Sequence, residues 1–207
     1  MRLNHTRQEQ RPARQTRPWT GWTDLPQPGQ SMVEFALCIP VFVLLLFGTL
    51  EVGMLYKTHA AYDQAAQQAV RIAASAGNAG DADAQMLTAL QQHLVGENLN
   101  QIISVTVFDA TVAGTPVNAA AQTNYIYSST QHQFVCQGAP TVLPCPPPSP
   151  PSAYTYWDPL SRDTKVGELD HIGLRILYHY HSVTGMIPQT NASENANALI
   201  EPNSYQP

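Results

Sequence analysis

The stretch PGQSMVEFALCIPVFVLLLFG, residues 28–48, decides how this chain is organised. No charged residue occurs from Phe35 to Leu50, and the apolar pattern resumes after Glu51. About 20 helical residues, each rising 1.5 Å, cross the roughly 30 Å hydrocarbon core of a bilayer. The sequence therefore predicts a transmembrane helix over residues 30–57. A buried helix of a soluble domain is less favoured, because such a helix normally keeps a polar face.

The charged residues are distributed unevenly around this apolar run. The 207 residues carry a net charge of -5, yet residues 1–29 contain five of the ten Lys and Arg residues and only two acidic ones. A positive flank of this kind stays in the cytoplasm while the remainder crosses the membrane. We expect a basic cytoplasmic leader over residues 1–29 and an exported domain over residues 58–207. No basic patch interleaved with aromatic residues follows, so nucleic acid is not an expected partner.

The junction between leader and helix has a specific spacing. The residues after Gly48 offer no small-residue cleavage site, and Cys38 lies near the start of the apolar run, so neither signal-peptidase nor lipoprotein processing fits. A cut after Gly29 would make Gln30 the first residue and Glu34 the fifth. The new amino group and the carboxylate would then offset each other's desolvation in an apolar assembly. The alternative is a glutamate that merely begins a helix at the interface.

A set of short motifs recurs in order through residues 29–76. They are a Val-Glu-Phe-Ala box, a proline, a Phe-Gly pair, a glutamate and an Ala/Arg-rich extension, namely Val33, Glu34, Phe35, Ala36, Pro40, Phe47, Gly48, Glu51 and residues 65–74. This pattern resembles the N-terminal signature of the TadE-like pseudopilins, small single-pass proteins of the tight-adherence (Flp pilus) secretion system. The leader is long for a type IV prepilin, and Gln30 stands where an aromatic residue or Met is common.

The resemblance implies a minor pilin-like subunit that is cut by a prepilin peptidase and needed for pilus assembly. Gly29, Gln30, Glu34 and Phe35 would be the processing and assembly residues. The implied partners are the membrane, other pilins or pseudopilins, the assembly platform and the peptidase. The protein would reside in the bacterial inner membrane with its N-terminus in the cytoplasm, or in the extracellular pilus. We expect no enzyme activity, no cofactor and no small-molecule substrate. The alternative is a permanently anchored protein that binds an envelope or surface ligand without cleavage.

The exported part is predicted to have an α+β, pilin-like fold in which the membrane helix continues as a stalk packed on a small antiparallel sheet. Small residues at helical spacing predict a packing face on this stalk. The protein's own sheet is its favoured cover, and other pilins are the alternative. The low hydrophobicity and the proline run at 144–151 predict a long loop insertion. The expected elements are helices over 58–76 and 82–95, strands near 102–109 and 171–183, and a disordered or loop insertion over 110–165.

The remaining candidate sites lie outside the leader. Cys136 and Cys145 are predicted to form a disulfide, because the exported side is oxidising. Glu51 could pair with Lys57, lie among lipid headgroups or contact a partner subunit. Trp157, Asp158 and Arg162 could form a salt-bridged loop at a sheet edge. Three histidines suggest a weak metal site, but exposed strand residues are the favoured interpretation and no metal is expected; they are His171, His179 and His181.

Overall fold

The computed structural model describes residues 29–138, 143–149, 155–185 and 187–202. The chain divides into two compact units between Leu44 and Leu45, and helix α1, Gln30–Ala76, runs through both. In the first unit, the described residues are Gly29 and the beginning of α1. The helix is continuous through Pro40. The predicted basic leader lies outside the described residues except for Gly29.

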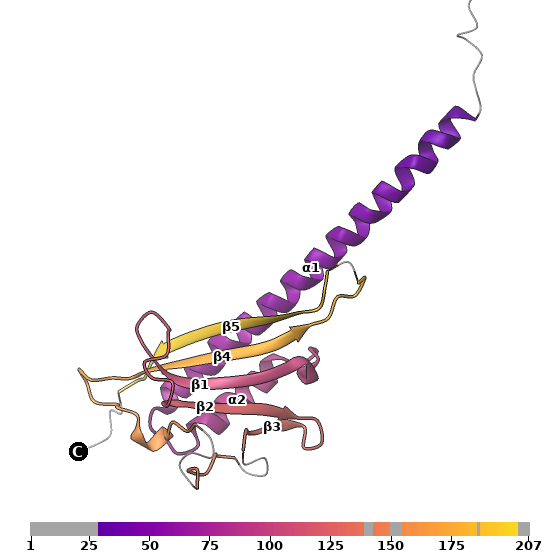
Figure 1. Ribbon diagram of the computed structural model, residues 1–207. Coiled ribbons are helices and arrows are strands. Elements are labelled where there is room, and N and C mark those ends of the chain that lie inside the picture. Colours follow the sequence, from indigo (N-terminus) through magenta and orange to yellow (C-terminus); the bar gives the residue numbers. More distant parts are fainter. Residues whose placement is uncertain (1–28, 139–142, 150–154, 186, 203–207) are drawn as a thin grey trace, which may run out of the picture. The chain divides into compact units, whose positions relative to one another are not determined.

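The second unit contains a five-stranded antiparallel sheet with the strand order β3-β2-β1-β4-β5 (Figure 1). This sheet, which follows a long apolar helix, confirms the predicted α+β class. The elements after α1 are α2 (Ala82–His93), η1 (Leu99–Gln101), β1 (Ile102–Ala110), β2 (Gln122–Ser128), β3 (Gln133–Cys136), η2 (Pro159–Ser161), β4 (His171–Tyr180) and β5 (Thr190–Leu199).

The hydrophobic core lies between one face of the sheet and the two helices α1 and α2. Helix α1 contributes small side chains such as Ala65, Ala66 and Ala69, which are fully buried. Small side chains let the helix backbone approach the sheet closely, as expected for a stripe of alanines covered by the protein's own strands. The ring of Tyr62 stacks on Tyr178 of β4 with 4.1 Å between centroids. Helix α2 adds apolar side chains from its buried face: Met86, Leu87 and Leu90.

One glycine is essential to the packing of the sheet. Phe108 of β1 lies opposite Gly173 of β4 in the antiparallel register. A Cβ atom at Gly173 would lie 2.3 Å from the Phe108 ring, which no real side chain tolerates. The absence of a side chain at Gly173 therefore gives the buried aromatic ring its place.

The structure corrects two of the predicted boundaries. The loop expected over residues 110–165 is wrong over 122–128 and 133–136, which form β2 and β3. Thr123 and Tyr125 of β2 are buried, and their polar neighbours Gln122 and Asn124 hide this alternation in an average of composition. The strand expected over 171–183 ends at Tyr180. Residues 143–149, which include the start of the proline run, are neither helix nor strand.

Candidate processing and assembly segment

Gly29 lies in an exposed turn directly before helix α1. Its carbonyl oxygen accepts a hydrogen bond from the backbone N–H of Val33 at 3.2 Å, so the helical hydrogen-bond pattern begins at this residue. A Cβ atom at Gly29 would meet no atom within 4 Å. The peptide bond after Gly29 is therefore at the start of the helix and follows an exposed residue.

Glu34 and Phe35 follow within the next turns of α1, and both side chains are exposed. Glu34 follows Gln30 by four residues, which is about one turn of the helix. The rise from Gln30 to Glu34 is about 6 Å. The four residues predicted for processing and assembly are thus grouped within two turns at the start of α1.

The surface of the next turns is almost entirely apolar and uncovered. Every described side chain from Ser31 to Leu50 is exposed, apart from the partly covered Gly48. The helix is long and apolar enough to cross a membrane by length and composition. A core helix of a soluble protein would bury this face, whereas an exposed apolar surface of this length suggests a membrane anchor.

Glu51 is the first buried residue of α1, although Val52, Met54 and Tyr56 after it are exposed again. Oxygen Oε1 accepts from the Tyr180 hydroxyl at 3.1 Å and from the Val183 N–H at 3.2 Å. Oxygen Oε2 accepts from the Thr184 N–H at 2.9 Å and from its hydroxyl at 2.8 Å. Glu51 thereby joins α1 to the connection between β4 and β5. This explains why strand β4 stops at Tyr180: the following N–H groups turn toward the carboxylate.

Comparison with known proteins bears on the part of α1 just described. Residues 29–71 match the family model for TadE-like protein. The match begins at Gly29 and contains Glu34 and Glu51, so it confirms the resemblance predicted from the sequence. A search of curated proteins and a search of solved structures found no match. The TadE-like match ends within α1, before the first residue of α2 and of the sheet.

Within the TadE-like segment, the expected partners of Glu51 need correction. The ammonium of Lys57 bonds to Glu97 Oε1 at 3.1 Å instead. The donors to Glu51 come from residues that the sequence reasoning did not single out, namely Tyr180, Val183 and Thr184. The Ser-Val-Thr-Gly stretch at 182–185 is a recognisable turn sequence. It does not indicate that the turn binds a carboxylate more than 120 positions away.

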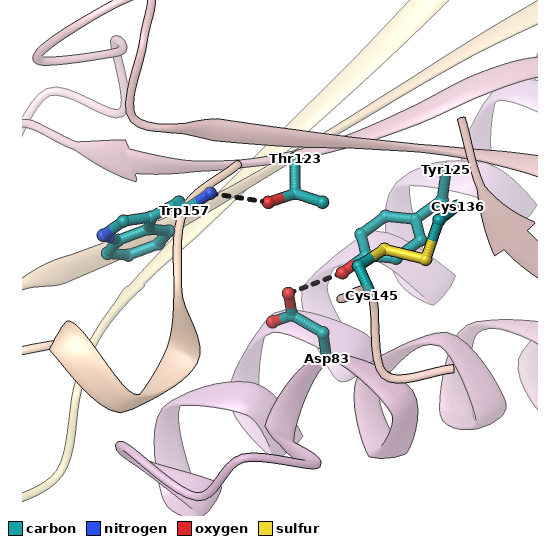
Figure 2. The surroundings of a disulfide bond; sticks show 6 residues. All are labelled: Asp83, Thr123, Tyr125, Cys136, Cys145 and Trp157. Carbon is teal, nitrogen blue, oxygen red and sulfur yellow. Dashed lines mark hydrogen bonds between the residues drawn. A yellow bond between two sulfur atoms is a disulfide. The ribbon is translucent and has the colours of Figure 1, made fainter. Parts of the chain in front are cut away.

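The structure joins Cys136 at the end of β3 to Cys145 by a disulfide, with 5.7 Å between the Cα atoms. Figure 2 shows this bond near Tyr125, whose hydroxyl donates to Asp83 Oδ2 at 2.7 Å. Burial, and then the Asp83 carboxylate, raises the pKa of Tyr125 far above its usual value, so the phenol keeps its proton. The disulfide therefore holds the segment after β3 close to a buried polar network.

Arg162 completes that network. Its guanidinium is buried, bonds to Asp83 and lies 4.4 Å from the centroid of the Trp157 ring. The backbone N–H of Trp157 donates a hydrogen bond to Thr123 Oγ1 at 2.8 Å and so fixes the position of this residue (Figure 2). Sequence reasoning grouped Trp157, Asp158 and Arg162 in a salt-bridged loop but missed Asp83 of α2. The Asp158 carboxylate instead accepts a hydrogen bond from the Leu160 N–H at 3.0 Å. The pair of Arg162 and Asp83 links the loop to the helix, which is a structural role.

The three histidines lie at or near the two ends of β4. The His179 ring nitrogens contact Asn191 Oδ1 at 2.7 Å and Gln189 Oε1 at 3.3 Å. The contact with Asn191, followed by that with Gln189, raises the pKa of His179. Its ring packs edge-on to His181 with 4.7 Å between centroids, whereas His171 begins the strand. Among the described residues, no group of three or more His, Cys, Asp or Glu side chains is placed to hold a metal ion.

Proposed function

We propose that this chain is a minor pilin-like membrane subunit, a pseudopilin, of a tight-adherence pilus system and is cut by a prepilin peptidase after Gly29. The observation that carries the proposal is the order of features along α1. An exposed glycine precedes the helix, a carboxylate follows five residues later, and an uncovered apolar surface extends to Leu50. The TadE-like match over residues 29–71 spans the same features.

The chemistry of the cut explains the position of Glu34. Cleavage after Gly29 leaves an ammonium group on Gln30 at the N-terminal end of a helix, where unpaired N–H groups already carry partial positive charge. A carboxylate one turn on can pair with this amine or with that of a neighbouring subunit. An unpaired charge in apolar surroundings costs several kcal/mol, so the pair lets the helix start enter a packed assembly.

The role proposed for the outer domain is structural rather than catalytic. Its sheet covers the second half of α1, and Glu51 joins the domain to the helix at the first buried residue of α1. The domain would be exported, and the helix would remain in the inner membrane or pack among other pilins and the assembly platform. The described part of the chain shows no three-residue metal cluster that would favour a metal-dependent activity.

Mass spectrometry of the mature N-terminus tests the cut. The protein is purified from cells with an active prepilin peptidase and, as a control, from cells that lack it. We expect a chain that begins at Gln30 in the first preparation and a longer chain in the second. A mature chain that begins at Met1 or Met32 in the presence of the peptidase contradicts the proposed processing.

A second experiment tests the role of Glu34 in assembly. The Glu34→Ala variant should insert into the membrane and yet fail to support pilus assembly, because the new amine has lost its partner. Glu168→Ala removes an exposed carboxylate from the outer domain and serves as the matched control. Normal assembly with Glu34→Ala would favour the alternative, a permanently anchored protein that binds an envelope or surface ligand.

A further inference from the structure

Two loops of the outer domain meet near Glu51, the first buried residue of α1. The connection between β4 and β5 is held there by Glu51. The connection from α2 to η1 lies beside it, because Ile102 at the start of β1 is paired with Tyr178 near the end of β4. Together with residues 54–58 of α1, these loops line a groove of ≈ 330 Å³.

Each of the two loops presents a large apolar side chain to solvent. Val95, just after α2, is 83% exposed, and Val183, between β4 and β5, is 68% exposed. Neither valine is needed to fill the core. On the adjoining face of α1, Tyr56 is 75% exposed, and aromatic residues at this level are typical of the membrane interface.

The groove between the loops carries both signs of charge. The Lys57 ammonium is largely exposed and pairs with the Glu97 carboxylate. A phospholipid headgroup offers a phosphate for the ammonium and, in phosphatidylethanolamine, an amine for the carboxylate. The groove residues Met54 and Lys57 follow Leu50 by roughly 6–11 Å along the helix axis. The interfacial layer of a bilayer is of similar depth, about 5–8 Å on each side.

We propose that this end of the domain is a bilayer-contacting rim, with Val95 and Val183 inserted among the lipid headgroups and the Lys57–Glu97 groove against a headgroup. The rim rests on the proposed function, since it requires that α1 span the membrane up to Leu50. The domain then has a second attachment to the bilayer besides α1, and it stands on the membrane surface through the loop that Glu51 holds.

The opposite end of the sheet provides matched controls. Val112 is 80% exposed and Val166 is 85% exposed, so both are as uncovered as the rim valines. Val112 follows Ala110, which is paired with His171 at the far end of β4, and Val166 precedes that same histidine. Exposure alone therefore does not distinguish the rim from the control positions. The rim valines differ from the control valines in position, because Val183 lines the groove and Val95 precedes Gly96, which also lines it.

Fluorescence quenching in bilayers tests the rim with the full-length chain. In a Cys38→Ser background, one cysteine is introduced by Val95→Cys, Val183→Cys, Val112→Cys or Val166→Cys, and it is labelled with an environment-sensitive fluorophore. The variants are reconstituted in phosphatidylethanolamine–phosphatidylglycerol vesicles that contain a lipid with a nitroxide on its headgroup. We expect loss of emission at positions 95 and 183 and little loss at 112 and 166. Equal quenching at all four positions, or none at 95 and 183, overturns the rim.

The native Cys38 separates a failure of the rim from a failure of the membrane anchor. This exposed cysteine lies inside the apolar stretch, so a label on it should be quenched by a nitroxide on the lipid acyl chain. Quenching at Cys38 without quenching at 95 and 183 supports the membrane anchor and contradicts the rim. No quenching at Cys38 contradicts the membrane anchor and therefore also the rim, which depends on it. Circular dichroism of each variant checks that the outer domain has remained folded.

Discussion

The two halves of helix α1 contain similar numbers of apolar residues but present them to different surroundings. From Ser31 to Leu50 large apolar side chains such as Leu44 are exposed, whereas from Glu51 to Ala76 the buried positions belong mainly to alanines. A large side chain suits lipid or a neighbouring helix, and a small one suits a sheet that approaches the helix backbone. Burial begins at Glu51, whose carboxylate is bound by the outer domain, and the last exposed large apolar side chain of α1 is Tyr56.

A charge placed in the first half should have the largest effect. Leu44→Arg introduces a guanidinium in the middle of the exposed apolar stretch, and an arginine at the centre of a membrane helix costs about 3 kcal/mol in insertion. We expect a much smaller fraction of the protein to resist alkaline extraction from membranes. Gln68→Arg makes the same charge at an exposed position of the second half and should leave retention unchanged. Equal retention of both variants would contradict the division of the helix.

Overpacking tests the same division in the opposite direction. Ala69 is fully buried against the sheet, so Ala69→Leu should lower the free energy of unfolding of the outer domain by roughly 1–3 kcal/mol. Ala36→Leu makes the same change where the side chain is exposed, and the stability of the domain should not change. Thermal unfolding followed by circular dichroism in detergent measures both. A stable Ala69→Leu variant would show that the second half of α1 is not in tight contact with the sheet.

The parts of this comparison differ in how well the sequence predicts them. An uninterrupted apolar run predicts the first half of α1, β-branched residues predict β1 and alternation predicts β4, because these signals are local. Strand β2 was missed, since Gln122 and Asn124 make its composition polar although Thr123 and Tyr125 are buried. The stability of such a strand depends on the elements that pack against its buried face, and a single sequence does not reveal these tertiary contacts.

The candidate site shows the same limit. Gly29 and Glu34 could be named from spacing, because the proposed cleavage site and the carboxylate proposed to pair with the new amino group lie five residues apart. The environment of Glu51 could not, since Tyr180 lies 129 positions further along the chain. The ion pair of Asp83 and Arg162 spans 79 positions and was likewise assigned to a local loop. Long-range polar contacts depend on the completed fold, and no periodicity in the sequence encodes them.

Neutralising the two glutamates of α1 sharpens the comparison between its halves. Glu51→Gln keeps the size of the side chain, but its amide group cannot accept all four hydrogen bonds that the carboxylate accepts, and those to a charged acceptor are the stronger ones. We expect a lower unfolding midpoint for the outer domain. Glu34→Gln, on the exposed half, should leave the midpoint unchanged while it weakens assembly. Equal midpoints for the two variants would mean that the Glu51 contacts contribute nothing to stability.

The smallest expected effect is a pH dependence in the second half of α1, where His59 pairs with Glu194 of β5. Burial raises the pKa of Glu194 above its ordinary 4.5, although His59 and the Tyr178 hydroxyl act against this and Asp63 adds to it. A carboxyl with a raised pKa binds its proton more tightly in the folded protein, so its stabilising contribution is lost as the pH rises above 4.5. Glu194→Gln should flatten this part of the curve of unfolding free energy against pH, whereas Glu168→Gln, at an exposed position, should not. If the slope of unfolding free energy against pH is the same for Glu194→Gln as for the unaltered protein, the Glu194 carboxyl is as well solvated as one on the open surface.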